Sequence, residues 1–222
     1  MDTAIITGAD QNFGQAVSRK LIQLGYRVFG LGQFLKTPTF HHHQFHPLGC
    51  DLTKASDIAR AIESIQARGR LISVLVHAAH VYPDHKDENR FGEADPGEIE
   101  AALRVHMLGP ILISRMLLHN LEECNGHIFF IAPHPPGRES AQPAIAGAIA
   151  GIQRFAVRLF QQSRDTGIRI TTLFPDRDAD AGQDETSAHT TDKVDPQAIA
   201  MALEHILRSA TEGNVITEYV VR

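Results

Sequence analysis

The stretch that decides the fold is Thr3-Ala4-Ile5-Ile6-Thr7-Gly8-Ala9-Asp10-Gln11-Asn12-Phe13-Gly14. Its β-branched run predicts a strand over 3–7, and the amphipathic pattern that follows predicts a helix over 13–24. Between them, Gly8 allows the backbone to turn past a phosphate, and Gly14 lets the helix pack closely on its strand. We expect the amides of Phe13, Gly14 and Gln15 to face a bound anion at the positive end of the helix.

Short apolar runs alternate with longer amphipathic stretches along the rest of the chain. Further strands are expected at 27–31, 48–52, 71–77, 127–131, 168–174 and 214–221, and further helices at 56–68, 97–121, 143–163 and 196–209. Such alternation implies parallel strands joined by right-handed crossovers. We therefore expect one α/β domain over residues 1–222, a doubly wound, Rossmann-type parallel sheet of about seven strands with helices on both faces.

Composition excludes several classes of protein. The chain has 222 residues, of which 43% are hydrophobic and 21% charged, as expected for a single folded domain. No run approaches ~18 consecutive apolar residues and no basic leader precedes the first strand, so neither a membrane span nor a signal peptide is expected. The net charge is −5, and the sequence contains no cluster of basic residues of the kind that binds nucleic acid. Cys50 and Cys124 lack any CxxC spacing, which favours a reducing, cytoplasmic location.

Five further motifs follow the first turn in a recognisable order. They are Cys50-Asp51-Leu52, His77-Ala78-Ala79-His80, Val105-His106-Met107-Leu108-Gly109, Gly151-Ile152-Gln153-Arg154-Phe155 and Ile168-Arg169-Ile170. Together with the first turn, they resemble the short-chain dehydrogenase/reductase family over nearly the whole chain. The resemblance implies an NAD(P)(H)-dependent oxidoreductase. It also implies cofactor contacts from Gly8, Asp10, Asn12, Phe13, Gly14, Gln33, Asp51, Leu52, Ala78, Ala79 and His80.

The residues that carry the family's chemistry are replaced. The family uses a serine, a tyrosine, a lysine and an asparagine; alignment on its motifs puts Pro133, Gln142, Ala146 and His106 at these positions. No tyrosine is followed four residues later by a lysine anywhere in the chain. General acid–base catalysis contributes ~10²–10⁴ in rate, so the loss is severe unless another group replaces the acid. Two functions stay open: an oxidoreductase with a rewired site, or a catalytically inactive dimeric binding or regulatory subunit.

Histidines and one tyrosine are the candidate replacements for the missing acid. His106, His134 and Tyr82 are expected near the nicotinamide side of the site, and a histidine titrates near neutral pH. A structural role for these histidines is the alternative, and a metal site is a further one. No metal is predicted, because the histidines come from separate segments without an HxxxH pair. His77 is expected to bond the backbone between strands, and residues 41–43, three consecutive histidines, to lie in a solvated loop.

Two differences from the family's sequence pattern, both in the first half of the chain, bear on the choice of cofactor. Asn12 stands at the family's middle glycine; because asparagine tolerates left-handed backbone, we expect the turn to survive. The second strand ends in Gly32-Gln33 without the acid that binds the ribose 2′-hydroxyl in NAD-preferring proteins. Lys36 could meet a 2′-phosphate. The sequence therefore slightly favours NADP over NAD, with binding of neither as the alternative.

Two segments bear on substrate and assembly. Residues 176–195 are rich in Asp and Glu and follow a predicted strand. We interpret them either as a lid on the substrate side or as a solvated loop. Histidine at position 106 resembles pteridine reductase-like members, so a small carbonyl or pteridine-like substrate is expected. The helix at 143–163 is rich in Ala and Gly, and in the family this helix pairs across a two-fold axis. A homodimer or homotetramer is therefore expected; packing on the chain's own sheet is the alternative.

Overall fold

Seven parallel strands form the centre of the molecule. A computed structural model describes residues 2–33, 40–68, 71–81, 94–132, 143–175, 195–209 and 216–221. The strands are β1 (Thr3–Thr7), β2 (Arg27–Gly32), β3 (Phe45–Gly49), β4 (Ile72–His77), β5 (His127–Ile131), β6 (Arg169–Pro175) and β7 (Ile216–Val221). Their order across the sheet is β3-β2-β1-β4-β5-β6-β7, and every neighbouring pair is parallel. The expected doubly wound α/β fold is confirmed.

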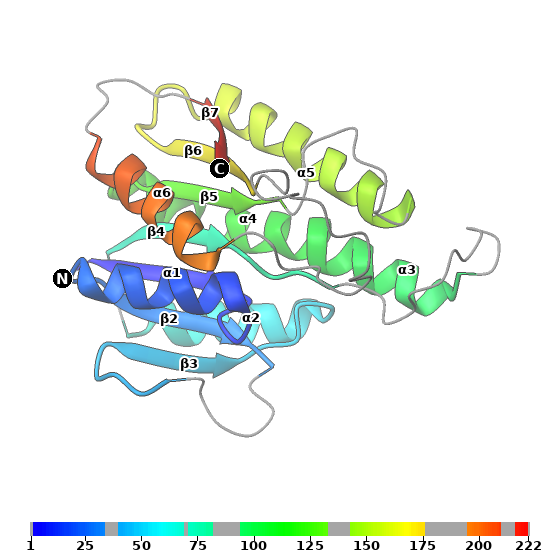
Figure 1. Ribbon diagram of the computed structural model, residues 1–222, viewed down its shortest axis with the longest axis horizontal. Coiled ribbons are helices and arrows are strands. Elements are labelled where there is room, and N and C mark those ends of the chain that lie inside the picture. Colours follow the sequence, from blue (N-terminus) through cyan, green and yellow to red (C-terminus); the bar gives the residue numbers. More distant parts are fainter. Residues whose placement is uncertain are drawn as a thin grey trace, which may run out of the picture.

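Helices cover both faces of the sheet (Figure 1). One face carries α1 (Asn12–Gln23) and α6 (Pro196–Arg208); the other carries α2 (Ala55–Gln66), α4 (Gly109–Glu123) and α5 (Pro143–Gln162). Because alternate strand residues point to opposite faces, Ile5 belongs to one core and Ile6 to the other. On the first face, Lys20 and Glu204 join α1 to α6 at 2.9 Å.

The long helix in the middle of the chain is not uniform. It comprises α3 (Pro96–Leu103), a π-helical turn η2 (Arg104–Leu108) and α4, where the sequence predicted one regular helix. Asp95 caps its start by accepting a hydrogen bond from Gly97 N at 3.0 Å. By length and composition, Pro96–Glu123 could cross a membrane, a test that core helices also pass. Here Ile113 and Leu117 are fully buried in the core of this domain.

The edge strand β3 lies three residues earlier than predicted. The sequence pattern placed it at 48–52 and left residues 33–47 irregular, whereas the strand begins at Phe45. His46 and Pro47 resemble loop residues, but Pro47 pairs with Gly30 of β2. Proline is tolerated here because β3 has a neighbouring strand on one side only. Residues 41–43 precede the strand and are exposed, as predicted for a solvated loop.

Candidate functional site

A cavity of about 460 Å³ lies at the carboxyl ends of β1, β2 and β4. In open α/β sheets, ligands bind in this region, where the strand order changes direction. The cavity wall brings together seven of the eleven predicted cofactor residues: Gly8, Asp10, Gln33, Asp51, Leu52, Ala79 and His80. Sequence reasoning omitted other wall residues, among them Gln11 and Thr53.

The turn after β1 depends on two glycines. Gly8 has a φ of +67°, and a Cβ atom there would lie 2.6 Å from the Cα atom of Ala79. Gly14 packs against the main chain of Gly8, so a side chain there would also clash. Asn12 is exposed and is the first residue of α1, within helical backbone, so its tolerance of left-handed backbone is not used. The turn survives because the positive φ falls on Gly8.

The amino terminus of α1 lacks a side-chain cap. The first bond of its ladder runs from Gln15 N to Gln11 O at 2.8 Å. The amide of Gln15 is therefore engaged, and its predicted role in facing an anion is wrong. The amides of Asn12, Phe13 and Gly14 precede the ladder, as the first amides of any helix do. They and the helix dipole form a positive end suited to a phosphate group.

Side chains join this turn to the segment that follows β4. The Gln11 amide donates to His80 O at 2.7 Å and accepts from His80 N at 2.9 Å. The hydroxyl oxygen of Thr7 accepts from Ala78 N at 3.1 Å and Ala79 N at 3.3 Å. Ala78 is fully buried and is not on the cavity wall, whereas Ala79 and His80 are. These bonds fix one side of the cavity.

Asp51 and its neighbours form the opposite side. Asp51 accepts hydrogen bonds from the Thr53 amide at 3.0 Å and the Thr53 hydroxyl at 2.6 Å, and its other oxygen pairs with Lys54 at 3.0 Å. The bond from the Thr53 hydroxyl is the main cause that holds the pKa of Asp51 below its usual value. Leu52 also lines this wall. Burial raises the pKa of the Cys50 thiol to about 12, so this wall residue stays protonated.

His106 contacts main chain rather than the cavity. Its Nε2 atom lies 2.9 Å from the Val81 carbonyl oxygen and 3.2 Å from the Val81 amide nitrogen. Burial lowers the pKa of His106, although the bond to Val81 acts in the opposite direction. A neutral ring held to the backbone supports the structural alternative for His106 more than a role in proton transfer.

The other two histidines near the end of β4 differ in position. His77 is buried, and its Nε2 atom lies 3.0 Å from the Ser114 hydroxyl of α4. The prediction of a backbone partner for His77 is wrong, because the ring points to this helix. Burial lowers the pKa of His77 to about 3. His80 is the one of the three that lines the cavity, with its ring centroid 5.7 Å from that of His106.

Several predictions fall on parts of the chain beyond the described residues. These are Tyr82, Pro133, His134 and Gln142, together with 176–194 of the acidic segment and Lys36. Ala146, which the sequence motifs align with the family's lysine, lies on the exposed side of α5. Within the described ranges, no three side chains of His, Cys, Asp or Glu are grouped so as to hold a metal ion.

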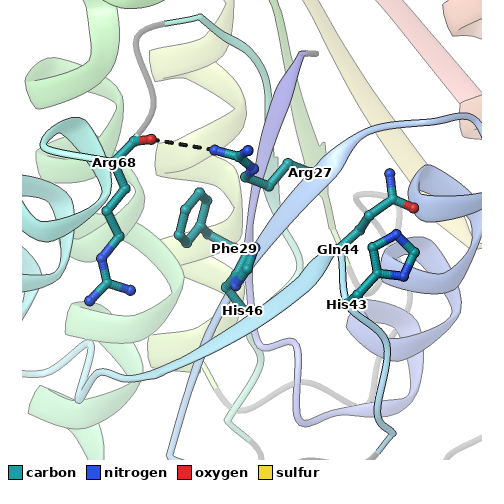
Figure 2. Close-up of a pocket in the computed structure, with 6 residues that line it drawn as sticks. All are labelled: Arg27, Phe29, His43, Gln44, His46 and Arg68. Carbon is teal, nitrogen blue, oxygen red and sulfur yellow. Dashed lines mark hydrogen bonds between the residues drawn. The ribbon is translucent and has the colours of Figure 1, made fainter.

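A second cavity, of about 300 Å³, lies near the start of β2 (Figure 2). It is lined by Arg27, Phe29, His43, Gln44, His46 and Arg68. Arg27 donates to the main-chain oxygen of Arg68 at 3.4 Å, and the Arg68 guanidinium points away from that bond (Figure 2). This cavity is at the end of the sheet opposite to the one where α/β folds bind ligands, so the first cavity is the candidate site.

Comparisons with known proteins identify the family of the chain. The family model for short chain dehydrogenases matches residues 2–179. A Haemophilus influenzae protein named as a probable NADP-dependent dehydrogenase is 26% identical over 183 residues, which cover 78% of this chain and 70% of that protein.

Two solved structures share the fold. A metagenomic short-chain oxidoreductase in complex with NADP has a TM-score of 0.81 at 20% identity, covering 98% of this chain and 97% of that one. A Brucella ovis oxidoreductase in complex with a partially ordered NAD has a TM-score of 0.76 at 20% identity, and the match covers 100% of this chain and 99% of that one. Because the family model spans most of the sequence, the chain belongs to the short chain dehydrogenase family.

Proposed function

We propose that this chain binds NAD or NADP in the cavity at the carboxyl ends of β1, β2 and β4. The observation that carries the proposal is the uncapped amino terminus of α1 beside that cavity, with Gly8 at a φ of +67°. This arrangement leaves the backbone amides of Asn12, Phe13 and Gly14 for a pyrophosphate. The relative named as NADP-dependent and the neighbours solved with NADP and NAD support the same cofactor class.

Within that proposal, the family's proton-transfer residues are replaced. The three tyrosines are Tyr26, Tyr82 and Tyr219, and no lysine lies between Lys86 and Lys193. Ala146 offers an exposed methyl group where the family has its lysine, and it has no proton to donate. The chain is therefore an NAD(P)(H)-dependent oxidoreductase by family whose carbonyl chemistry is slowed by ~10²–10⁴ or lost.

A second candidate function follows from the same replacements. It is a catalytically inactive pseudoenzyme that serves as a dimeric binding or regulatory subunit. The contact between His106 and Val81 removes one candidate for the missing proton donor, because the ring engages main chain and does not line the cavity. For the oxidoreductase, the substrate is a small carbonyl or pteridine-like compound, and His134 or Tyr82 supplies the proton.

Calorimetric titration with NADH and NADPH tests the binding proposal. Saturable binding of at least one dinucleotide is expected, and Gly8→Ala abolishes it because the new Cβ atom meets the backbone of Ala79. Gly25→Ala is the matched control: Gly25 also has a positive φ, at +90°, but nothing lies near its Cβ position, and it lies beyond the other end of α1. This variant should lose stability and still bind. Absence of binding to the wild-type chain at millimolar dinucleotide would refute the proposal.

Turnover measurements then separate the two candidate functions. The dinucleotide-loaded chain is assayed against a panel of carbonyl and pteridine compounds. If the wild-type chain turns over and His134→Ala or Tyr82→Phe abolishes that turnover, the chain is an oxidoreductase and the substituted residue is its acid. Binding without turnover favours the pseudoenzyme.

A further inference from the structure

The carboxylate of Asp10 lies against the end of β2. Its Oδ2 atom accepts a hydrogen bond from Gln33 N at 3.0 Å. Its Oδ1 atom is the nearest atom to the position that a Cβ would take on Gly32. Asp10, Gly32 and Gln33 all line the 460 Å³ cavity. A residue of the first turn therefore brings a negative charge to the last residues of the second strand.

The surrounding bonds hold this turn in place. Ala9 N donates to Leu31 O at 3.1 Å, which fixes the turn on the end of β2. Gln15 donates from its side chain to Asp10 O at 3.1 Å. The carboxylate is thus positioned by its own turn as well as by Gln33. An ionised carboxylate has about four acceptor sites, so the bond from Gln33 leaves capacity for a ligand hydroxyl.

The end of the second strand is where dinucleotide-binding sheets read the adenosine ribose. An acid there accepts the 2′-hydroxyl of NAD, whereas a basic residue accommodates the 2′-phosphate of NADP. In this chain β2 ends at Gly32 and is followed by Gln33, so the strand end supplies no acid of its own. The described cavity wall carries two carboxylates, Asp10 and Asp51, and no lysine or arginine. Lys54, nearby, is paired with Asp51.

We infer that Asp10 replaces the missing strand-end acid and selects NAD(H) over NADP(H), accepting the ribose 2′-hydroxyl and repelling a 2′-phosphate. The inference rests on the proposed dinucleotide binding. It reverses the slight preference for NADP that the sequence suggests. That preference rested on the missing strand-end acid and on Lys36, which lies outside the described residues, whereas Asp10 comes from a turn 23 residues before Gln33.

Titration of the full chain with NADH and NADPH, monitored by fluorescence, tests the inference. The wild-type chain should bind NADH at least about tenfold more tightly than NADPH, since the Asp10 carboxylate repels the negative charge of a 2′-phosphate. Asp10→Asn keeps the shape and removes the charge, so the ratio of the two dissociation constants should fall toward one, mainly through tighter NADPH binding. Asp57→Asn is the control: it removes a negative charge from α2 that does not line the cavity, and the ratio should stay unchanged.

A measurement on the wild-type chain alone guards against misfolding of the variant. Salt screens the repulsion, so the preference for NADH should narrow between low and high ionic strength. The inference is overturned if both dinucleotides bind and NADPH binds as tightly as NADH or tighter, or if the ratio is independent of both salt and Asp10→Asn. Failure of both dinucleotides to bind overturns the proposed function as well, whereas binding of NADPH without a preference for NADH overturns the inference alone.

Discussion

His106 shows how a residue suited to proton transfer is used here to hold the backbone. One ring nitrogen lies within hydrogen-bonding distance of both the carbonyl and the amide of Val81. An asparagine side chain, which the family resemblance implies at this position, could satisfy the same two groups with its amide. Burial lowers the pKa of His106, so the ring is neutral at pH 7. We therefore propose that histidine at this position keeps one hydrogen bond to Val81 and does not supply an acid.

Substitution of His106 tests this assignment. His106→Ala removes the hydrogen bond between the ring Nε2 atom and the Val81 main chain and should lower the free energy of unfolding by about 1–3 kcal/mol. His106→Asn should recover part of that loss. Urea denaturation of the three proteins measures the effect. The opposite pattern, in which His106→Ala stays fully stable but loses turnover, would identify His106 as a proton donor.

At the scale of elements, the turn after β1 and the segment after β4 form one unit. Gln11 and His80 are 69 residues apart in sequence, and two hydrogen bonds join them. The hydroxyl of Thr7 adds two more bonds from the same segment. The phosphate-binding end of α1 and the wall formed by Ala79 and His80 are therefore expected to move together.

Removal of the Gln11 side chain should uncouple these two elements. Gln11→Ala deletes the acceptor of the His80 amide, so hydrogen exchange at His80 should quicken and dinucleotide affinity should fall by about tenfold. Gln23→Ala, an exposed glutamine at the end of the same helix, is the control and should change neither quantity. Unchanged exchange at His80 in Gln11→Ala would show that other contacts hold the segment.

Sequence patterns predict most of the elements but not the links between them. The bounds of β1 and β5 are as predicted, because apolar runs and the glycines beside them are local signals. The shift of β3 and the π-helical turn η2 were missed, since both depend on packing against neighbouring elements. Of the candidate site, the glycines and Asp51 were predicted from their motifs. Two hydrogen-bonded pairs were not predicted: Gln11 with His80, and Asp10 with Gln33. Each pair joins residues far apart in the sequence, so local hydrophobic periodicity does not indicate it.

At the scale of the whole molecule, the two cores enclose histidines that must stay neutral. Burial lowers the pKa of His77 to about 3, and it lowers the pKa values of His106 and His127 below their ordinary range. The unfolded chain protonates these residues near pH 6.5. The unfolded state therefore binds more protons than the folded state once the pH falls below that value, and stability decreases.

Acidification from pH 7 to 4.5 should thus destabilise the fold. As the pH falls below 6.5, each buried histidine that is still neutral in the folded chain lowers the free energy of unfolding by about 1.4 kcal/mol per pH unit. Urea unfolding at several pH values measures the slope. His77→Asn, which keeps a partner for Ser114, should make the slope shallower, whereas His119→Asn on the exposed side of α4 should not. Equal slopes in all three proteins would contradict the account.

The exposed face of α5 bears on assembly. Ala146, Gly147 and Ala150 are exposed there, and nothing lies near the Cβ position of Gly147. We propose that this face pairs with a second copy in a homodimer or homotetramer. Light scattering should then give a mass of two or four chains. Ala150→Glu should shift it toward one chain, whereas Gln162→Glu at the end of the same helix should not; a monomeric wild-type chain would exclude the pairing.

The central claim is that the dinucleotide site is kept while the family's proton-transfer residues are replaced. A single fluorescence experiment with NADH tests both parts. The account predicts that the NADH signal rises to saturation as protein is added, and then persists for many minutes after a panel of carbonyl compounds is supplied. Two results would contradict it: no change in signal at millimolar NADH, or oxidation of bound NADH at the roughly 1–10³ s⁻¹ of an ordinary enzyme.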